Sequence, residues 1–118
     1  MDRMRFVTHR DRQIFLVDFT DCAPDEVAEI ADRVPEAVTQ EPLCSVLLLA
    51  DFSRAQFTRE SVERVKIAAV FDRPHLKRSA WVLTQNLPKA LYDSVRSFSG
   101  RQIPIFATRE EALDYLVS

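Results

Sequence analysis

The fold is decided by residues 45–65, which read SVLLLADFSRAQFTRESVERV. The run from Val46 to Ala50 is continuously apolar, and this predicts a strand that is covered on both faces of a sheet. Thr58 then stands in front of a helix as its N-cap. The apolar residues of this helix that we expect to face the core are Val62, Val65, Ala69 and Val70. A buried strand followed by a helix is the repeating unit of an α/β protein.

The same unit precedes this segment. Residues 13–19 are apolar on both faces and predict another covered strand, which follows a short strand over residues 5–8 and a tight turn. A helix is expected from Pro24, because apolar residues recur at helical spacing as far as Val38. Proline removes one backbone hydrogen bond, so we expect Pro35 to kink or divide this helix.

The pattern continues toward the C-terminus. Residues 79–83 predict a buried strand, and a helix is expected over about 87–99, with Gly100 as its left-handed cap. Residues 103–107 predict a last short strand. Thr108, with a glutamate three residues later, forms a capping box for a final helix.

This order of elements predicts one α/β domain over residues 1–118. Strands that alternate with helices form mostly parallel sheets with right-handed crossovers. The tight turn after the first strand instead makes that strand an antiparallel edge strand. We therefore expect a central, mostly parallel sheet of about five strands, flanked by about four helices.

Four segments, taken in order, resemble the STAS domain superfamily, the fold of bacterial anti-sigma factor antagonists. They are FLVDFTDCAPDEV (15–27), residues 45–65 quoted above, RPHLKRSA (73–80) and FSGRQIPIFATREEALDYLV (98–117). The chain looks most like the stand-alone, largely uncharacterised STAS-like proteins, often described as related to the CRAL–TRIO lipid-binding fold. The resemblance implies a sheet flanked by helices with an antiparallel first strand, and it implies little about chemistry.

In antagonist STAS domains, a serine that is phosphorylated stands at the start of the helix after the central strand. Aligning residues 51–61 on that segment puts Glu60 at or beside the place of that serine, with Ser61 next to it. Val62 stands where the family has a small glycine-containing turn, which departs from the pattern. Because a helix N-terminus favours negative charge, Glu60 could supply what phosphate supplies elsewhere.

Two groups of candidate site residues follow. The candidate interaction or regulatory residues are Asp51, Ser53, Thr58, Glu60 and Ser61. The candidate ligand rim consists of Thr84, Asn86, Thr108 and Arg109, at the carboxyl ends of the parallel strands, where open α/β sheets bind ligands. The alternative interpretation is that these residues cap helices and end strands, as Ser, Thr, Asn and Asp do in most proteins.

Composition argues against several classes of function. Gly100 is the only glycine, so the usual Walker loop and dinucleotide fingerprint are excluded. The formal net charge of −2 argues against a dedicated nucleic-acid binder. Cys22 and Cys44 match no metal-ligand spacing, and we expect two free, partly buried thiols. With no catalytic motif either, we expect no enzymatic activity, no cofactor and no metal.

The remaining expectations concern partners. No apolar stretch has the length of a transmembrane segment, and the N-terminus does not read as a signal peptide, so we expect a cytoplasmic protein. The basic cluster Arg73, His75, Lys77 and Arg78 would meet an anionic partner or headgroup, or would simply be a solvated turn. An exposed first strand would allow a homodimer.

We therefore expect a non-enzymatic regulatory or protein-interaction module of the STAS type. The alternative is a binder of a small apolar or anionic, lipid-like ligand at the carboxyl end of the sheet.

Overall fold

The computed structural model describes residues 3–83, 93 and 103–118. The helix expected over about 87–99, its cap at Gly100, and the candidate rim residues Thr84 and Asn86 lie outside the described residues.

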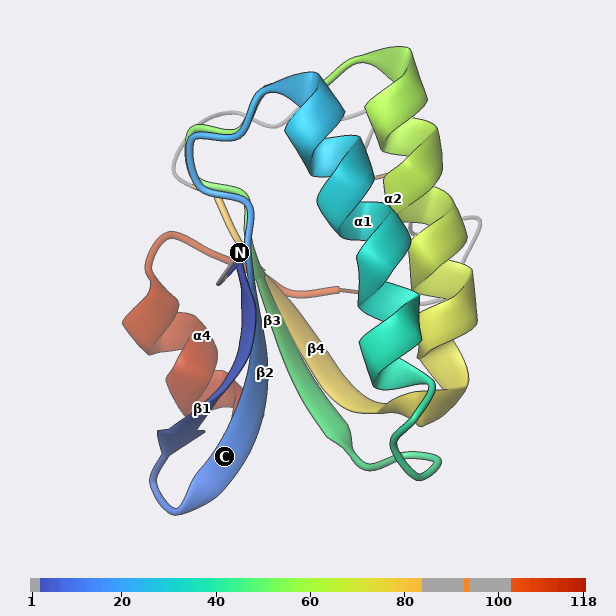
Figure 1. The fold of residues 1–118 in the computed structure, drawn as a ribbon. Coiled ribbons are helices and arrows are strands. Elements are labelled where there is room, and N and C mark those ends of the chain that lie inside the picture. The colour runs from blue at the N-terminus through green and yellow to red at the C-terminus, as the bar shows by residue number, and fades with distance from the viewer. Residues whose placement is uncertain (1–2, 84–92, 94–102) are drawn as a thin grey trace.

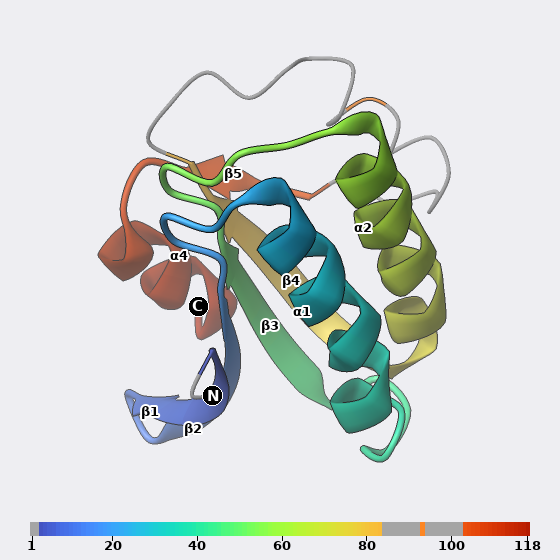
Figure 2. The ribbon, with the colours of Figure 1, turned by 45° about the horizontal axis from the view of Figure 1, so that its top comes forward.

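In the described part of the chain, five strands form one mixed sheet in the order β1-β2-β3-β4-β5 (Figures 1 and 2). The strands are β1 (Met4–His9), β2 (Arg12–Asp18), β3 (Val46–Asp51), β4 (Leu76–Val82) and β5 (Ile105–Phe106). β1 pairs antiparallel with β2, and the other three pairs are parallel. This confirms the predicted α/β fold, with a mostly parallel sheet and an antiparallel edge strand.

The helices cover both faces of this sheet. α1 (Pro24–Val38) and α2 (Arg59–Asp72) lie side by side on one face, and α4 (Arg109–Leu116) lies on the other (Figures 1 and 2). A 3₁₀ turn over Arg73–His75 joins α2 to β4. Within the described residues there are thus three α-helices, fewer than the four expected, and the fourth was predicted in a segment that is not described.

We expected Pro35 to kink or divide α1, but this helix is continuous, so the division did not occur. Proline at this position lies in the last turn, and the helix ends three residues later at Val38. The one backbone bond that proline removes is therefore lost where the helix is about to end. At the other end, Pro24 occupies the first turn and Glu26 accepts a hydrogen bond from the backbone N–H of Ala23 at 3.0 Å.

The core has two layers, because strand side chains alternate between the faces of the sheet. Between the sheet and the α1–α2 pair lie the larger set of buried side chains, among them Val17, Ile30, Leu48, Phe52 and Trp81. Between the sheet and α4 lie Ile14, Leu16, Leu49, Val82 and Leu116. The five residues of the apolar run in β3 are buried, as predicted, and Asp51 at the end of the strand is buried as well.

Candidate functional site at the carboxyl edge of the sheet

The carboxyl ends of β2 and β3 are built by the same local turn. The sequence DFT closes β2 from Asp18, and DFS closes β3 from Asp51. Oδ1 of Asp18 accepts hydrogen bonds from the backbone N–H of Thr20 at 2.9 Å and from its hydroxyl at 2.6 Å. Oδ1 of Asp51 accepts the same two bonds from Ser53, also at 2.9 and 2.6 Å. Each aspartate thus turns the chain away from its strand.

These two turns run side by side (Figure 1). Asp18 and Asp51 are partners in the parallel register of β2 and β3, and the N–H of Phe19 donates to the carbonyl oxygen of Asp51 at 2.8 Å. The rings of Phe19 and Phe52 stack with centroids 4.5 Å apart and planes 13° apart. The stack helps to keep the two carboxylates next to each other at the ends of the neighbouring strands β2 and β3.

Arg109, the first residue of α4, joins the two carboxylates. Its Nε lies 2.5 Å from Oδ2 of Asp51, and its Nη2 lies 3.2 Å from Oδ1 of Asp18. Arg3 also contacts Asp18, with its Nη1 at 3.7 Å from Oδ1, and donates to the carbonyl oxygen of Thr20 at 2.8 Å. Two arginines and two aspartates therefore hold the ends of β2, β3 and α4 together.

The pKa of the Asp18 carboxyl reflects this setting. Burial raises the pKa, but the hydrogen bonds from Thr20 and the charge of Arg109 together outweigh burial, so the pKa lies below the ordinary value of 3.8. Burial likewise lowers the pKa of Arg109, and its contacts with Asp51 and Asp18 more than reverse this effect. Both groups therefore stay charged at neutral pH.

A second ion pair lies just beyond the two turns. Asp21 and Arg54 both have left-handed backbone, with φ of 58° and 59°. Nε and Nη2 of Arg54 contact the two carboxylate oxygens of Asp21 at 2.7 and 3.1 Å. The hydrogen bond from Arg54 lowers the pKa of Asp21. Because both side chains are more than 60 % exposed, this pair contributes little to stability.

The contacts favour a structural role for this polar cluster. Oδ1 of each aspartate is engaged by its own turn, and Oδ2 of Asp51 is engaged by Arg109. Among the sequence-predicted residues, the structure thus brings together Asp51, Ser53 and Arg109. Thr108 lies beside them as the N-cap of α4, where its hydroxyl oxygen accepts from the N–H of Glu111 at 3.2 Å. This is the capping interpretation that the sequence had left open.

The other predicted residues form the first turn of α2. Thr58 is the N-cap, and its hydroxyl oxygen accepts from the N–H of Ser61 at 3.3 Å. The hydroxyl oxygen of Ser61 accepts from the N–H of Thr58 at 2.9 Å, and Ser61 is fully buried. Glu60 is exposed and lies 3.9 Å from Arg64. Of the three hydroxyl residues among the candidate interaction or regulatory residues, Ser53 and Ser61 are buried and Thr58 is exposed.

An open hollow adjoins this turn. It has a volume of about 470 Å³ and lies between the first turns of α1 and α2. Its lining consists of Pro24, Asp25, Ala28, Thr58, Glu60 and Ser61. The two carboxylates, Asp25 and Glu60, are both exposed and give the rim of this hollow a negative charge.

The α2 face, which we define as Ile67, Val70 and Phe71, carries apolar side chains outward. Their exposed fractions are 45 %, 39 % and 59 %. The expectation that Val70 faces the core was therefore wrong, since Val65, Ala68, Ala69 and Asp72 form the buried face at helical spacing. A groove of about 350 Å³ runs between α1 and this face, past Pro35, Ile67 and Phe71.

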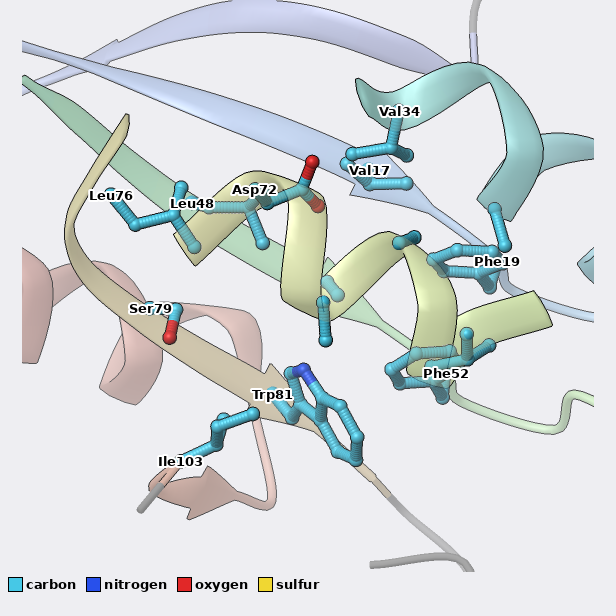
Figure 3. A pocket seen from close by; sticks show the side chains of 15 residues that line it. Val17, Phe19, Val34, Leu48, Phe52, Asp72, Leu76, Ser79, Trp81 and Ile103 are labelled. Atoms are coloured by element: carbon cyan, nitrogen blue, oxygen red, sulfur yellow. The ribbon is translucent and has the colours of Figure 1, made fainter. Parts of the chain in front are cut away.

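A small apolar cavity lies between the sheet and the α1–α2 pair (Figure 3). Trp81, Phe52 and Val34 contribute to its walls, and the buried polar side chains Asp72 and Ser79 also line it. Its volume is about 50 Å³. Pockets for drug-sized or lipid-like ligands are roughly an order of magnitude larger.

The basic cluster predicted near β4 is dispersed. Nη1 of Arg78 donates to the carbonyl oxygen of Tyr115 at 3.0 Å, and its guanidinium lies 5.5 Å from the centre of the Tyr115 ring. Nδ1 of His75 lies 2.7 Å from the carbonyl oxygen of Glu41. Two of the four basic side chains therefore bind parts of this chain, and Lys77 lies on an exposed position of the same strand.

Both cysteines are free thiols, as expected, but Cys44 is exposed, so the expectation that both are partly buried was wrong for this residue. Cys22 is buried, and burial raises the pKa of its thiol. Within residues 3–83, 93 and 103–118, no group of three or more His, Cys, Asp or Glu side chains is placed to hold a metal ion. In that same part of the chain, no helix has the length and apolar character required to cross a bilayer.

No family model, curated protein or solved structure matches this chain.

Sequence reasoning missed Asp18, Thr20 and Arg3. A signal for the first two was present, because the triplets DFT and DFS stand at the ends of two consecutive predicted strands and differ only in the hydroxyl residue. Parallel neighbouring strands place such repeated endings side by side. Arg3 carries no comparable signal, since its contact with Asp18 depends on how the hairpin is paired.

Proposed function

We propose that this chain is a non-enzymatic protein-interaction module of the STAS type, and that the α2 face is its working surface. The observation that carries the proposal is the exposure of Ile67, Val70 and Phe71. They stand at i, i+3 and i+4 on one helix, so they form one contiguous apolar surface. Apolar surfaces of this kind on water-exposed helices are typical of protein contact sites.

The polar residues at the carboxyl edge are less suited to binding a partner, because they already bind one another. Asp51 and Ser53 are buried and bonded to each other, and Arg109 bridges two carboxylates. A partner would have to disrupt these contacts to use them. The α2 face can be contacted without breaking any of them, and the groove along α1 gives a partner side chain room to enter.

A regulatory form of this proposal would place phosphate at the start of α2. Thr58 is the exposed hydroxyl there, and phosphate at a helix N-terminus gains from backbone N–H groups. Asp25 and Glu60 stand close by in the same hollow and would repel it. The proposal therefore takes constitutive binding through the α2 face as the working mode.

A paired capture experiment tests this proposal. The wild-type chain and the double variant Ile67→Ser, Phe71→Ser would be immobilised and exposed to lysate of the source organism. We expect a defined partner to be retained by the wild type and lost with the double variant. Both side chains are largely exposed, so the free energy of unfolding should change by less than about 1 kcal/mol.

Leu43→Ser is the matched control, because Leu43 is 69 % exposed and lies outside the α2 face. This variant should retain the partner. If the wild type and the double variant retain the same proteins in equal amounts, the α2 face is not the working surface.

A further inference from the structure

The outer edge of β1 is a second surface with binding character, and it does not depend on the α2 face. Among the residues that the structure describes, β1 stands at the end of the strand order and pairs only with β2, over six residue pairs without a register shift (Figure 2). It contains no proline. Proline and β-bulges are two of the features that prevent another strand from pairing with an edge strand, and β1 has neither.

The hairpin register shows which backbone groups point outward. A two-residue turn at Arg10 and Asp11 makes His9 and Arg12 a hydrogen-bonded pair. Such pairs recur at every second residue, and the bond from the N–H of Asp18 to the carbonyl oxygen of Arg3 at 2.6 Å fits this alternation. The residues between them therefore direct their N–H and C=O groups away from β2; these are Met4, Phe6 and Thr8.

Within the described part of the chain, no backbone group beyond the hairpin is hydrogen-bonded to these three residues. Their donors and acceptors recur at the spacing of a strand. An extended segment is the chain conformation that satisfies such a row.

The side chains around this edge are mostly basic, and this favours a partner with negative charge. Residues 3–13 contain four arginines and one aspartate, whereas the whole chain has a formal net charge of −2. Arg5 and Arg12 are exposed, and Arg10 lies 3.3 Å from Asp114 of α4. Phe6 is 48 % exposed and packs on Phe15 with ring centroids 5.1 Å apart, so it offers an apolar surface beside the charges.

A second copy is a poor occupant of this edge. Pairing β1 with the β1 of another molecule would bring two arginine-rich hairpins together, and like charges on neighbouring strands are destabilising. The homodimer expected from sequence is therefore disfavoured at this edge. An acidic segment has the complementary charge.

We propose that the outer edge of β1 binds an extended acidic segment of another protein, which adds to the sheet as a sixth strand. The backbone of the segment pairs with Met4, Phe6 and Thr8. Its carboxylates lie near Arg5 and Arg12, and one apolar side chain packs on Phe6.

Binding of a synthetic probe tests this proposal on the full chain. The probe is the end-blocked peptide Glu-Val-Glu-Phe-Glu-Val-Glu, and its comparison is the same peptide with lysine at each glutamate. We expect the acidic peptide to shift the backbone amide resonances of Met4, Phe6 and Thr8 and to slow their hydrogen exchange. The lysine peptide should bind at least about tenfold more weakly, and added salt should weaken the binding of the acidic peptide.

Two variants separate backbone pairing from charge. Thr8→Pro removes one outward N–H and leaves the hydrogen bonds to β2 in place. It should lower the affinity for the acidic peptide at least about tenfold. The double variant Arg5→Glu, Arg12→Glu should have a similar effect. Arg59→Glu, at an exposed position on α2, is the matched control and should bind as the wild type does. Amide spectra of each variant establish that it is folded.

Three results would overturn the proposal. One is resonance shifts away from β1, and another is equal affinity for the two peptides. The third is a dimer in sedimentation that Thr8→Pro abolishes, because the occupant of the edge would then be a second copy. A failure here leaves the α2 face untouched, since the capture experiment uses neither this edge nor these variants.

Discussion

At the scale of single residues, Arg109 bridges two carboxylates at the carboxyl edge. It is the first residue of α4, yet its guanidinium spans the carboxylates that end β2 and β3. The Asp51 side chain is only 4 % exposed, so its charge is separated from water and depends on this partner. A buried carboxylate that loses its ion-pair partner is costly to the folded state.

We predict that Arg109→Ala lowers the free energy of unfolding by about 1–3 kcal/mol, measured by urea titration. The value stays below that of a fully buried pair because the Arg109 side chain is 37 % exposed and solvent screens its charge. Arg54→Ala is the control, since it breaks the exposed ion pair with Asp21 and should leave the urea midpoint nearly unchanged. If the two variants lose the same free energy of unfolding, the ion pairs of Arg109 contribute no more to stability than the exposed pair of Arg54.

At the scale of elements, helix starts are the best-determined features of this chain. α2 begins after Thr58 and α4 after Thr108, both as the sequence predicts, and each hydroxyl oxygen accepts a backbone N–H three residues later. These bonds are local, so the sequence around each cap is sufficient to specify them. The apolar faces are less local, as Val70 shows, because a partner element decides which side is buried.

Thr58→Ala should therefore destabilise the protein by about 1 kcal/mol, because the N–H of Ser61 loses its acceptor. Chemical denaturation followed by circular dichroism measures this loss. Gln56→Ala, at an exposed position two residues before the cap, is the comparison and should be close to neutral. A neutral Thr58→Ala would mean that the Ser61 hydroxyl alone sustains the first turn.

At the scale of the whole molecule, several carboxylates together determine how the free energy of unfolding changes at acid pH. The pKa of Asp18, Asp21 and Asp114 is lowered in the folded protein, for Asp114 mainly by the hydrogen bond with His9. The unfolded chain therefore binds more protons than the folded chain in the acid range. Stability from these groups is fully present above the unfolded pKa of about 4 and is lost as the pH falls through the lower folded values.

We expect the urea midpoint to fall as the pH is lowered from about 4. In Asp18→Asn this fall should be shallower than in the wild type, because one lowered pKa no longer contributes. Urea titrations at a series of pH values between 7 and 2.5 would give both curves. Parallel curves for the two proteins would contradict the assignment of a lowered pKa to Asp18.

The sequence by itself determined the order of the described elements, the burial of β3 on both faces of the sheet and the antiparallel first strand. These depend on apolar runs, helical spacing and a tight turn, which are properties of neighbouring residues. It also named Asp51, Ser53 and Arg109 as candidate site residues, although it placed Arg109 in a different group from Asp51 and Ser53.

Only the tertiary structure decided what that edge contains. The contact of Arg109 with Asp18 spans 91 positions, and Arg3 joins them through the pairing of a hairpin, so no local pattern records either contact. The exposure of Ile67 and Phe71 was decided in the same way. Local patterns specify elements because their causes lie within a few residues. Sites and surfaces are decided by which elements pack together, and that depends on the whole chain.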